Sequence, residues 1–115
     1  MIDTRTHGIL DYVTGAVLIV APYVFGFATG GVEQWLPQVL GAMTIVMSLL
    51  TRYELSLSKI IPLKVHLAVD MGSGALLAVS PWLFGFAPVI WWPHLLVGLL
   101  EIVVPLLTRR EERAE

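Results

Sequence analysis

Charged residues divide this chain into two long blocks that are almost wholly apolar. Residues 12–51 contain a single formal charge, Glu33, and residues 71–108 contain a single one, Glu101. Each block is about twice as long as the roughly 20 apolar residues that a helix needs to cross a bilayer. A chain built from such blocks is expected to fold within a membrane.

A turn signal near the middle of each block divides it into two predicted helices. The first block is interrupted by Ala28-Thr29-Gly30-Gly31 and the second by Ala87-Pro88-Val89. We therefore predict an all-α membrane protein with four transmembrane helices. Their expected ranges are 8–28, 34–52, 66–86 and 91–108.

The composition agrees with this class and excludes several others. Of the 115 residues, 57% are hydrophobic and 14% charged, whereas soluble domains have about 45–50% apolar and about 25% charged residues. So short a chain cannot bury such an excess in one core, so the lipid bilayer is the expected partner. The net charge of −2 and the absence of cysteine argue against nucleic-acid binding, disulfides and thiolate metal sites.

The basic residues predict how the helices are oriented. All of them fall on one side of the predicted topology: Arg5, Arg52, Lys59, Lys64, Arg109, Arg110 and Arg113. By the positive-inside rule, both termini and the central segment are then cytoplasmic. Aromatic residues gather toward the opposite side, as in an interfacial belt: Tyr23, Trp35, Trp82, Trp91 and Trp92.

The chain contains an internal repeat. Residues 7–28 match residues 66–87 with 11 identities in 22 positions, including His7 with His66 and Asp11 with Asp70. After a loop that is two residues shorter, Leu-Leu-Thr-Arg at 49–52 matches the same letters at 106–109. Hydrophobic bias alone does not align histidine, aspartate, proline and arginine in one register.

This repeat predicts two tandem two-helix units in parallel orientation, because each unit returns the chain to its starting side. We expect repeat 1 over 7–54, an interfacial linker over 55–65, repeat 2 over 66–111 and a cytoplasmic tail over 109–115. Together they form a single transmembrane domain, 1–115. Parallel repeats are less common than inverted ones in alternating-access carriers, although they occur there.

Ser80-Pro81-Trp82, set inside a predicted helix and matched in the first copy by Ala21-Pro22-Tyr23, resembles the SPW-repeat family of small bacterial integral membrane proteins. The resemblance covers nearly the whole chain. It implies a location in the bacterial cytoplasmic (inner) membrane, and it implies no particular activity or cofactor. The first copy keeps only the proline and an aromatic residue, so the serine hydroxyl is expected to be needed at most once.

Two histidine–aspartate pairs are the first candidate site. His7 with Asp11, and His66 with Asp70, lie four residues apart and so share one helix face. If the first and third helices are neighbours, the four side chains could converge and hold a divalent transition metal or relay protons.

A structural explanation of the same residues is also open. The helix that follows each aspartate ends in an arginine, Arg52 or Arg109. In an antiparallel hairpin, Asp11 with Arg52 and Asp70 with Arg109 would form ion pairs that stabilise the hairpin, and such pairs often imitate functional sites.

Glu101 is the second candidate, because it matches Thr44 in the first copy and therefore breaks the repeat. At its predicted depth a carboxylate should face the interior of the bundle. It either serves a function or hydrogen-bonds a neighbouring helix or subunit.

Two functions follow from these residues. The sequence favours association, as an assembly partner or homo-oligomer; the alternative is binding or conduction of a metal, proton or small ligand through the His–Asp pairs. No cofactor is predicted, and an enzyme is not favoured because no nucleophile is paired with a base.

Overall fold

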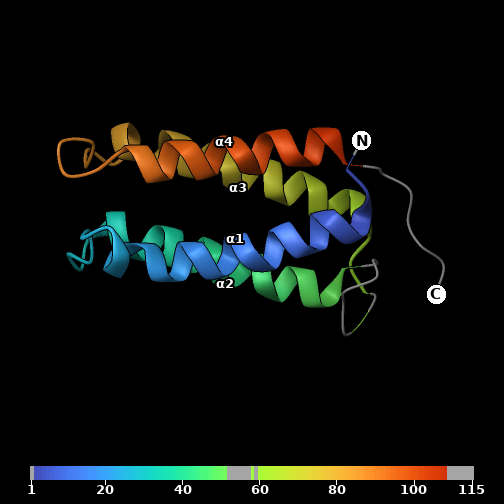
Figure 1. Ribbon diagram of the computed structural model, residues 1–115. Helices are drawn as coiled ribbons and strands as arrows, with labels where there is room; N and C mark the ends of the chain where they lie inside the picture. Colours follow the sequence, from blue (N-terminus) through green and yellow to red (C-terminus); the bar gives the residue numbers. More distant parts are fainter. Residues whose placement is uncertain (1, 52–57, 59, 109–115) are drawn as a thin grey trace.

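The computed structural model describes residues 2–51, 58 and 60–108, and within them the fold is all-helical (Figure 1). There are four helices in the described part of the chain: α1 (Thr4–Val24), α2 (Val32–Leu50), α3 (Leu63–Leu83) and α4 (Trp92–Leu107). The predicted tail and part of the predicted linker lie outside the described residues.

The helices form two antiparallel hairpins. α1 packs mainly against α2, and α3 against α4, whereas the two hairpins touch each other less extensively. The α1–α2 and α3–α4 loops lie together at one end of the molecule, and the start of α1, the end of α2 and the start of α3 lie at the other (Figure 1). A small apolar core of Leu18, Leu36, Leu40 and Leu77 joins α1, α2 and α3.

α1 begins and ends about four residues before its predicted range. It begins at Thr4 because the Asp3 carboxylate caps it, accepting a bond of 2.7 Å from the Thr6 amide. It ends at Val24 because Gly26 adopts a positive φ of 76° and the Phe27 amide donates back to the Pro22 carbonyl. This is the Schellman arrangement. It lies inside the apolar stretch, so hydrophobicity alone does not predict that the helix ends there.

α3 is displaced from its predicted range in the same direction. Pro62 precedes its first residue and Gly85, with φ of 77°, follows its last turn. Proline is well tolerated at the start of a helix, where a missing N–H costs nothing. Three residues of the predicted linker, 63–65, therefore belong to α3.

The serine and proline of Ser80-Pro81-Trp82 act together inside α3. Pro81 has no N–H to donate to the carbonyl four residues earlier, Leu77. The Ser80 hydroxyl, fully buried, donates to that carbonyl at 2.7 Å. Ser80 thus satisfies the acceptor that the proline leaves free, as polar side chains do in membrane helices; the matching Ala21 has no hydroxyl.

Paired glycines allow the two helices of each hairpin to approach closely. A Cβ added at Gly41 would lie 2.7 Å from the Gly15 carbonyl oxygen, and one at Gly98 would lie 2.6 Å from that of Gly74. Small residues at such crossings are typical of helices that pack within membranes.

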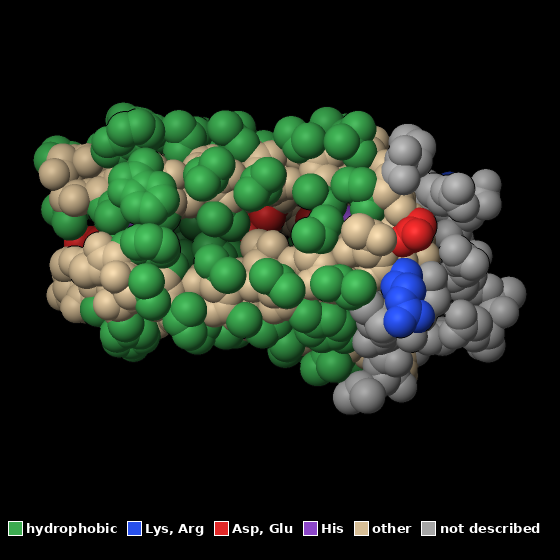
Figure 2. All heavy atoms as spheres, viewed as in Figure 1, with side chains coloured by type: hydrophobic (Ala, Val, Ile, Leu, Met, Phe, Trp, Pro, Cys, Tyr) green, Lys and Arg blue, Asp and Glu red, His purple; other side chains and the backbone are tan. Residues whose placement is uncertain are grey.

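The outer surface is apolar along the whole length of the bundle (Figure 2). By length and composition, α1 and α3 are each able to cross a membrane, and α4 is a shorter apolar helix. Only 39% of the apolar window of α1 and 44% of that of α3 are buried, so neither helix is enclosed as the core helix of a soluble domain would be.

We expect Gly98→Ala to lower the free energy of unfolding by about 1–3 kcal/mol, because the new methyl group would lie 2.5 Å from the Ala78 backbone nitrogen. Thermal unfolding in detergent measures this loss. Gly72→Ala is the matched control, since nothing lies within 4 Å of the added Cβ, and it should be neutral or stabilising by up to about 1 kcal/mol. Equal effects of the two substitutions would contradict the close approach of α3 and α4.

Candidate functional site

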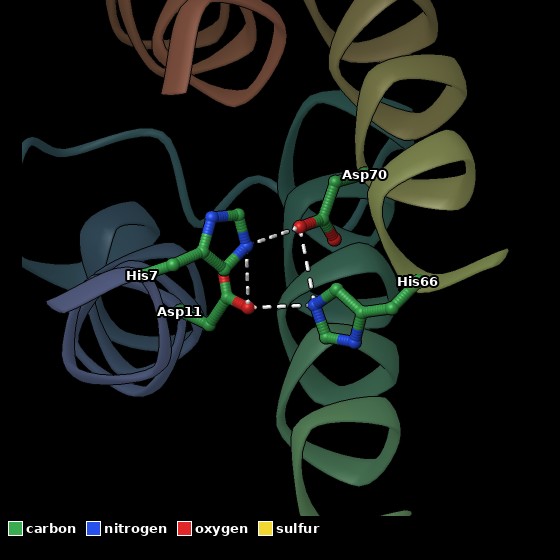
Figure 3. A group of neighbouring side chains, drawn as sticks. All are labelled: His7, Asp11, His66 and Asp70. Carbon is green, nitrogen blue, oxygen red and sulfur yellow. Dashed lines mark hydrogen bonds and ion pairs between the residues drawn. The ribbon is translucent and has the colours of Figure 1, made fainter. Parts of the chain in front are cut away.

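Four ionisable side chains converge between α1 and α3. His7 and Asp11 project from α1 toward His66 and Asp70 of α3 (Figure 3). Each offers one nitrogen or oxygen atom, and these four atoms lie within 4.8 Å of one another. We call these four residues the quartet.

Nitrogen and oxygen alternate around the quartet. His7 Nε2 lies 3.0 Å from Oδ2 of both Asp11 and Asp70. His66 Nε2 lies 2.6 Å from Oδ2 of Asp11 and 3.1 Å from Oδ2 of Asp70. Each imidazole therefore contacts the aspartate of its own helix and that of the opposite hairpin.

The helical period places these side chains in register. Within each helix, histidine and aspartate are one turn apart on one face, and that face points into the bundle. Both histidines are fully buried, and Asp11 and Asp70 are 7% and 5% exposed. The positions that the repeat aligns thus meet in one buried site.

A threonine from the opposite hairpin holds each imidazole. The Thr108 hydroxyl is 2.8 Å from His7 Nδ1, and the Thr51 hydroxyl contacts His66 Nδ1 at 2.5 Å. Each hydroxyl also donates its proton to the carbonyl four residues earlier, Val104 or Met47. The threonine oxygens therefore accept from Nδ1–H and set which ring nitrogen carries that proton.

The hydrogen-bond pattern restricts the charge of the quartet. With Nδ1–H donated to threonine, each Nε2 contacts two carboxylate oxygens among the described residues, and ionised carboxylates accept hydrogen bonds but do not donate them. Each Nε2 lone pair consequently needs a proton or a metal cation between it and the aspartates. Two protons or one divalent cation would both make the quartet neutral.

The donor set also suits a transition metal. The four nitrogen and oxygen atoms, separated by 2.6–3.1 Å around the ring, are close enough together for all of them to face one cation. Imidazole nitrogen suits zinc, copper and nickel. Metal-binding histidines usually donate their other ring N–H to a hydrogen-bond acceptor. In the quartet, a threonine hydroxyl takes this place for each imidazole.

Glu101, the asymmetric candidate, lies beside the quartet rather than within it. A cavity of about 90 Å³ extends from His7, Asp11 and Asp70 to Glu101 and Thr44. Figure 2 shows acidic side chains at the bottom of a hollow between the two hairpins. The cavity therefore connects the quartet to Glu101, a carboxylate that breaks the repeat.

The predicted ion pairs involve residues that are not described. Arg52 and Arg109 lie outside the described residues, so pairing with Asp11 and Asp70 stays a prediction. In the described part of the chain, Asp11 Oδ2 contacts both histidines and accepts from the Ser48 hydroxyl at 3.4 Å.

The proline–aromatic residues lie at the other end of the bundle. Pro22 and Pro81 are buried, whereas Tyr23 and Trp82 are 66% and 56% exposed. The Trp82 ring lies 6.3 Å from that of Trp91. Their place on the exposed surface suits the predicted aromatic belt and lies away from the quartet.

Sequence reasoning did not assign a role to three buried polar residues. Thr51 and Thr108 hold the histidines, and both belong to the repeated Leu-Leu-Thr-Arg segment that could have drawn attention to them. His94, 1% exposed, lies between the Phe27 and Phe86 rings and donates from Nε2 to the Glu33 carbonyl at 2.9 Å. It ties α4 to α2 at the loop end of the bundle.

We expect Thr108→Val to lower the free energy of unfolding by about 1–3 kcal/mol, because it leaves the buried His7 Nδ1–H without an acceptor. Thermal unfolding in detergent measures the change. Thr108→Ser retains the hydroxyl and should keep most of the stability. A valine variant as stable as the serine variant would show that the hydroxyl does not hold His7.

Comparison with known proteins agrees with the architecture described above. Searches of curated proteins and of solved structures gave no match. The family model of the SPW repeat domain matches residues 5–108, which include the quartet and, apart from the first residue of α1, all four described helices. The match extends over nearly the whole chain, and the chain belongs to the SPW repeat family, in agreement with the resemblance carried by Ser80-Pro81-Trp82.

Proposed function

We propose that all four helices cross the membrane as two tandem hairpins of the same orientation. Support comes from large apolar side chains that are exposed on every helix, for example Val17, Val46, Val79 and Leu99 at 41–53%. Soluble monomers rarely expose continuous apolar patches of more than a few hundred Å². The close Gly15–Gly41 and Gly74–Gly98 approaches at matching positions support the tandem arrangement.

In this proposal the quartet lies at the cytoplasmic end of the bundle in a bacterial inner membrane. Of the basic residues, Arg5 and Lys64 are described, and both are exposed in the first turns of α1 and α3, the turns that lead into His7 and His66. Basic residues that flank membrane helices favour the cytoplasmic side. Both termini would then be cytoplasmic.

Cysteine labelling tests this topology, because the chain has no native cysteine. Cysteines placed at Thr29 and Val89, both exposed in the loops between paired helices, should react with a membrane-impermeant maleimide in intact cells. Cysteine at Ile60, 64% exposed, should react only after permeabilisation. The opposite labelling pattern would invert the proposed orientation, and loops labelled from different sides would contradict four spans.

For function, we propose that the quartet binds one divalent transition-metal cation in exchange for protons. The observation that carries this proposal is the ring of two Nε2 and two Oδ2 atoms, with each Nδ1 already engaged by a threonine. A divalent cation would neutralise the aspartates and occupy both Nε2 lone pairs at once. The same residues would exchange protons when no metal is bound.

Association with a partner, the other function left open by the sequence, has less support. Four helix glycines are used within the hairpins, Gly15, Gly41, Gly74 and Gly98, and Gly72 is left exposed on α3. The remaining exposed surface is mainly Val, Leu and Ile, which lipid chains cover as well as a protein does. Binding at the quartet is therefore the proposed function, and a native mass measurement in detergent would reveal assembly.

Metal titration of the purified protein tests the proposal. The wild type should bind about one Zn²⁺ or Co²⁺ per chain, with Co²⁺ giving d–d absorption bands that report nitrogen and oxygen ligation. His7→Gln together with His66→Gln should weaken binding more than about 100-fold, since the loss of a supporting residue alone costs about 10–100-fold. Binding should also weaken as the pH falls, because protons compete for both Nε2 atoms.

His94→Gln is the matched control, since His94 is a buried histidine outside the quartet. It should leave the metal affinity within a few-fold of the wild type. A wild type that binds no divalent metal near neutral pH would overturn the proposal, as would equal loss of affinity in the His94 variant. Far-UV circular dichroism of each variant separates loss of ligands from loss of fold.

A further inference from the structure

Glu101 is a buried carboxylate without a hydrogen-bond partner. Its side chain projects from the middle of α4, it is 9% exposed, and neither Oε1 nor Oε2 has a hydrogen-bond partner in the described part of the chain. Burying an unpaired carboxylate in an apolar environment is costly. A residue of this kind in a membrane bundle either takes up a proton or is balanced by a bound cation.

The cavity beside Glu101 offers oxygen atoms to such a group. Thr44, from α2, lines the cavity and donates its hydroxyl proton to the Leu40 carbonyl at 2.9 Å, which leaves its oxygen able to coordinate a cation. Asp11 and Asp70 use Oδ2 for every contact in the quartet, and Figure 3 shows the second oxygen of Asp70 turned out of the ring. Thr14 also lines the cavity.

The volume is suited to a partly hydrated ion. The cavity measures about 90 Å³, several times the roughly 10–15 Å³ that one water needs on the same measure. Glu101 lies seven residues before Thr108, the threonine that holds His7. It is therefore about 10 Å closer to the loop end of the bundle, measured along α4. The position is therefore separate from the quartet and deeper in the bundle.

The charges around Glu101 indicate the charge of the ion that would balance it. The quartet is neutral with either two protons or one divalent cation, and no described Lys or Arg lines the cavity. When Glu101 is ionised, its charge is therefore not balanced by described residues. One positive charge would balance it.

We propose that this cavity binds one monovalent metal cation, of which Na⁺ is the probe, between Glu101 and Thr44. Hard cations prefer oxygen ligands, and the residues around Glu101 offer carboxylate and hydroxyl oxygen. The Glu101 site depends on the function proposed for the quartet in one respect, because the charge balance treats the quartet as neutral. It makes the protein a two-cation binder in which Glu101 belongs to the second site alone.

Thermal unfolding of the full chain in detergent tests the site. NaCl is compared with N-methylglucamine chloride at constant ionic strength, since N-methylglucamine is too large for the cavity. For the wild type, we expect Tm to rise by about 5 °C at a Na⁺ concentration about tenfold above Kd. Glu101→Gln, which removes the charge and keeps the shape, should abolish the Na⁺-specific rise and keep Zn²⁺ binding within a few-fold.

His66→Gln is the reciprocal control. It should lose Zn²⁺ binding and keep the Na⁺-specific rise, so failure of the quartet proposal and failure of the Glu101 proposal give different results. If Glu101→Gln does not yield folded protein, Thr44→Val takes its place and should weaken the Na⁺ response at least about tenfold, as the loss of a ligand does.

Two results would overturn the proposal. The first is a wild type whose Tm responds to pH but not to Na⁺, which would mean that Glu101 carries only a proton. The second is an equal Na⁺ response in the wild type and in Glu101→Gln, which would place the ion elsewhere. Either result leaves the Zn²⁺ measurement on the quartet intact.

Discussion

The described bundle is organised around four ionisable side chains that are buried in contact with one another between α1 and α3. An isolated carboxylate in an apolar interior is strongly disfavoured, and removing one partner of a buried pair leaves the other uncompensated. Each imidazole contacts both aspartates, so every aspartate is shared between the histidine of its own hairpin and that of the other. The quartet thus joins two hairpins that otherwise touch less than their own helices do.

The remaining polar contacts between the hairpins support this arrangement. Thr51 and Thr108 each reach the histidine of the other hairpin, and His94 bonds a backbone carbonyl of α2 at the loop end. The two ends of the bundle are therefore linked by directed bonds, with apolar packing between them. Glu101 departs from this pattern. Its carboxylate has no hydrogen-bond partner among the described residues, and it faces a cavity next to the quartet.

The sequence predicted much of the fold and part of the site. Two apolar blocks with central turn signals predicted the number and order of the helices that the structure describes. Helix ends were displaced by up to about four residues, because Asp3 caps α1 beyond the apolar stretch and Gly26 ends it early. The candidate residues His7, Asp11, His66 and Asp70 were identified by their spacing, whereas Thr51 and Thr108 were overlooked because their role depends on the opposite hairpin.

The amino-acid sequence by itself determined that the chain is apolar, that its few charges are concentrated near helix ends, and that each histidine shares a helix face with an aspartate. These are local properties, since they follow from composition and from the 3.6-residue period. Only the tertiary structure decided which residues meet across the bundle: the alternating nitrogen–oxygen ring, the threonines that orient each imidazole, and the cavity at Glu101. Those contacts join residues as many as 101 positions apart, and they depend on how closely the glycine crossings let the helices approach.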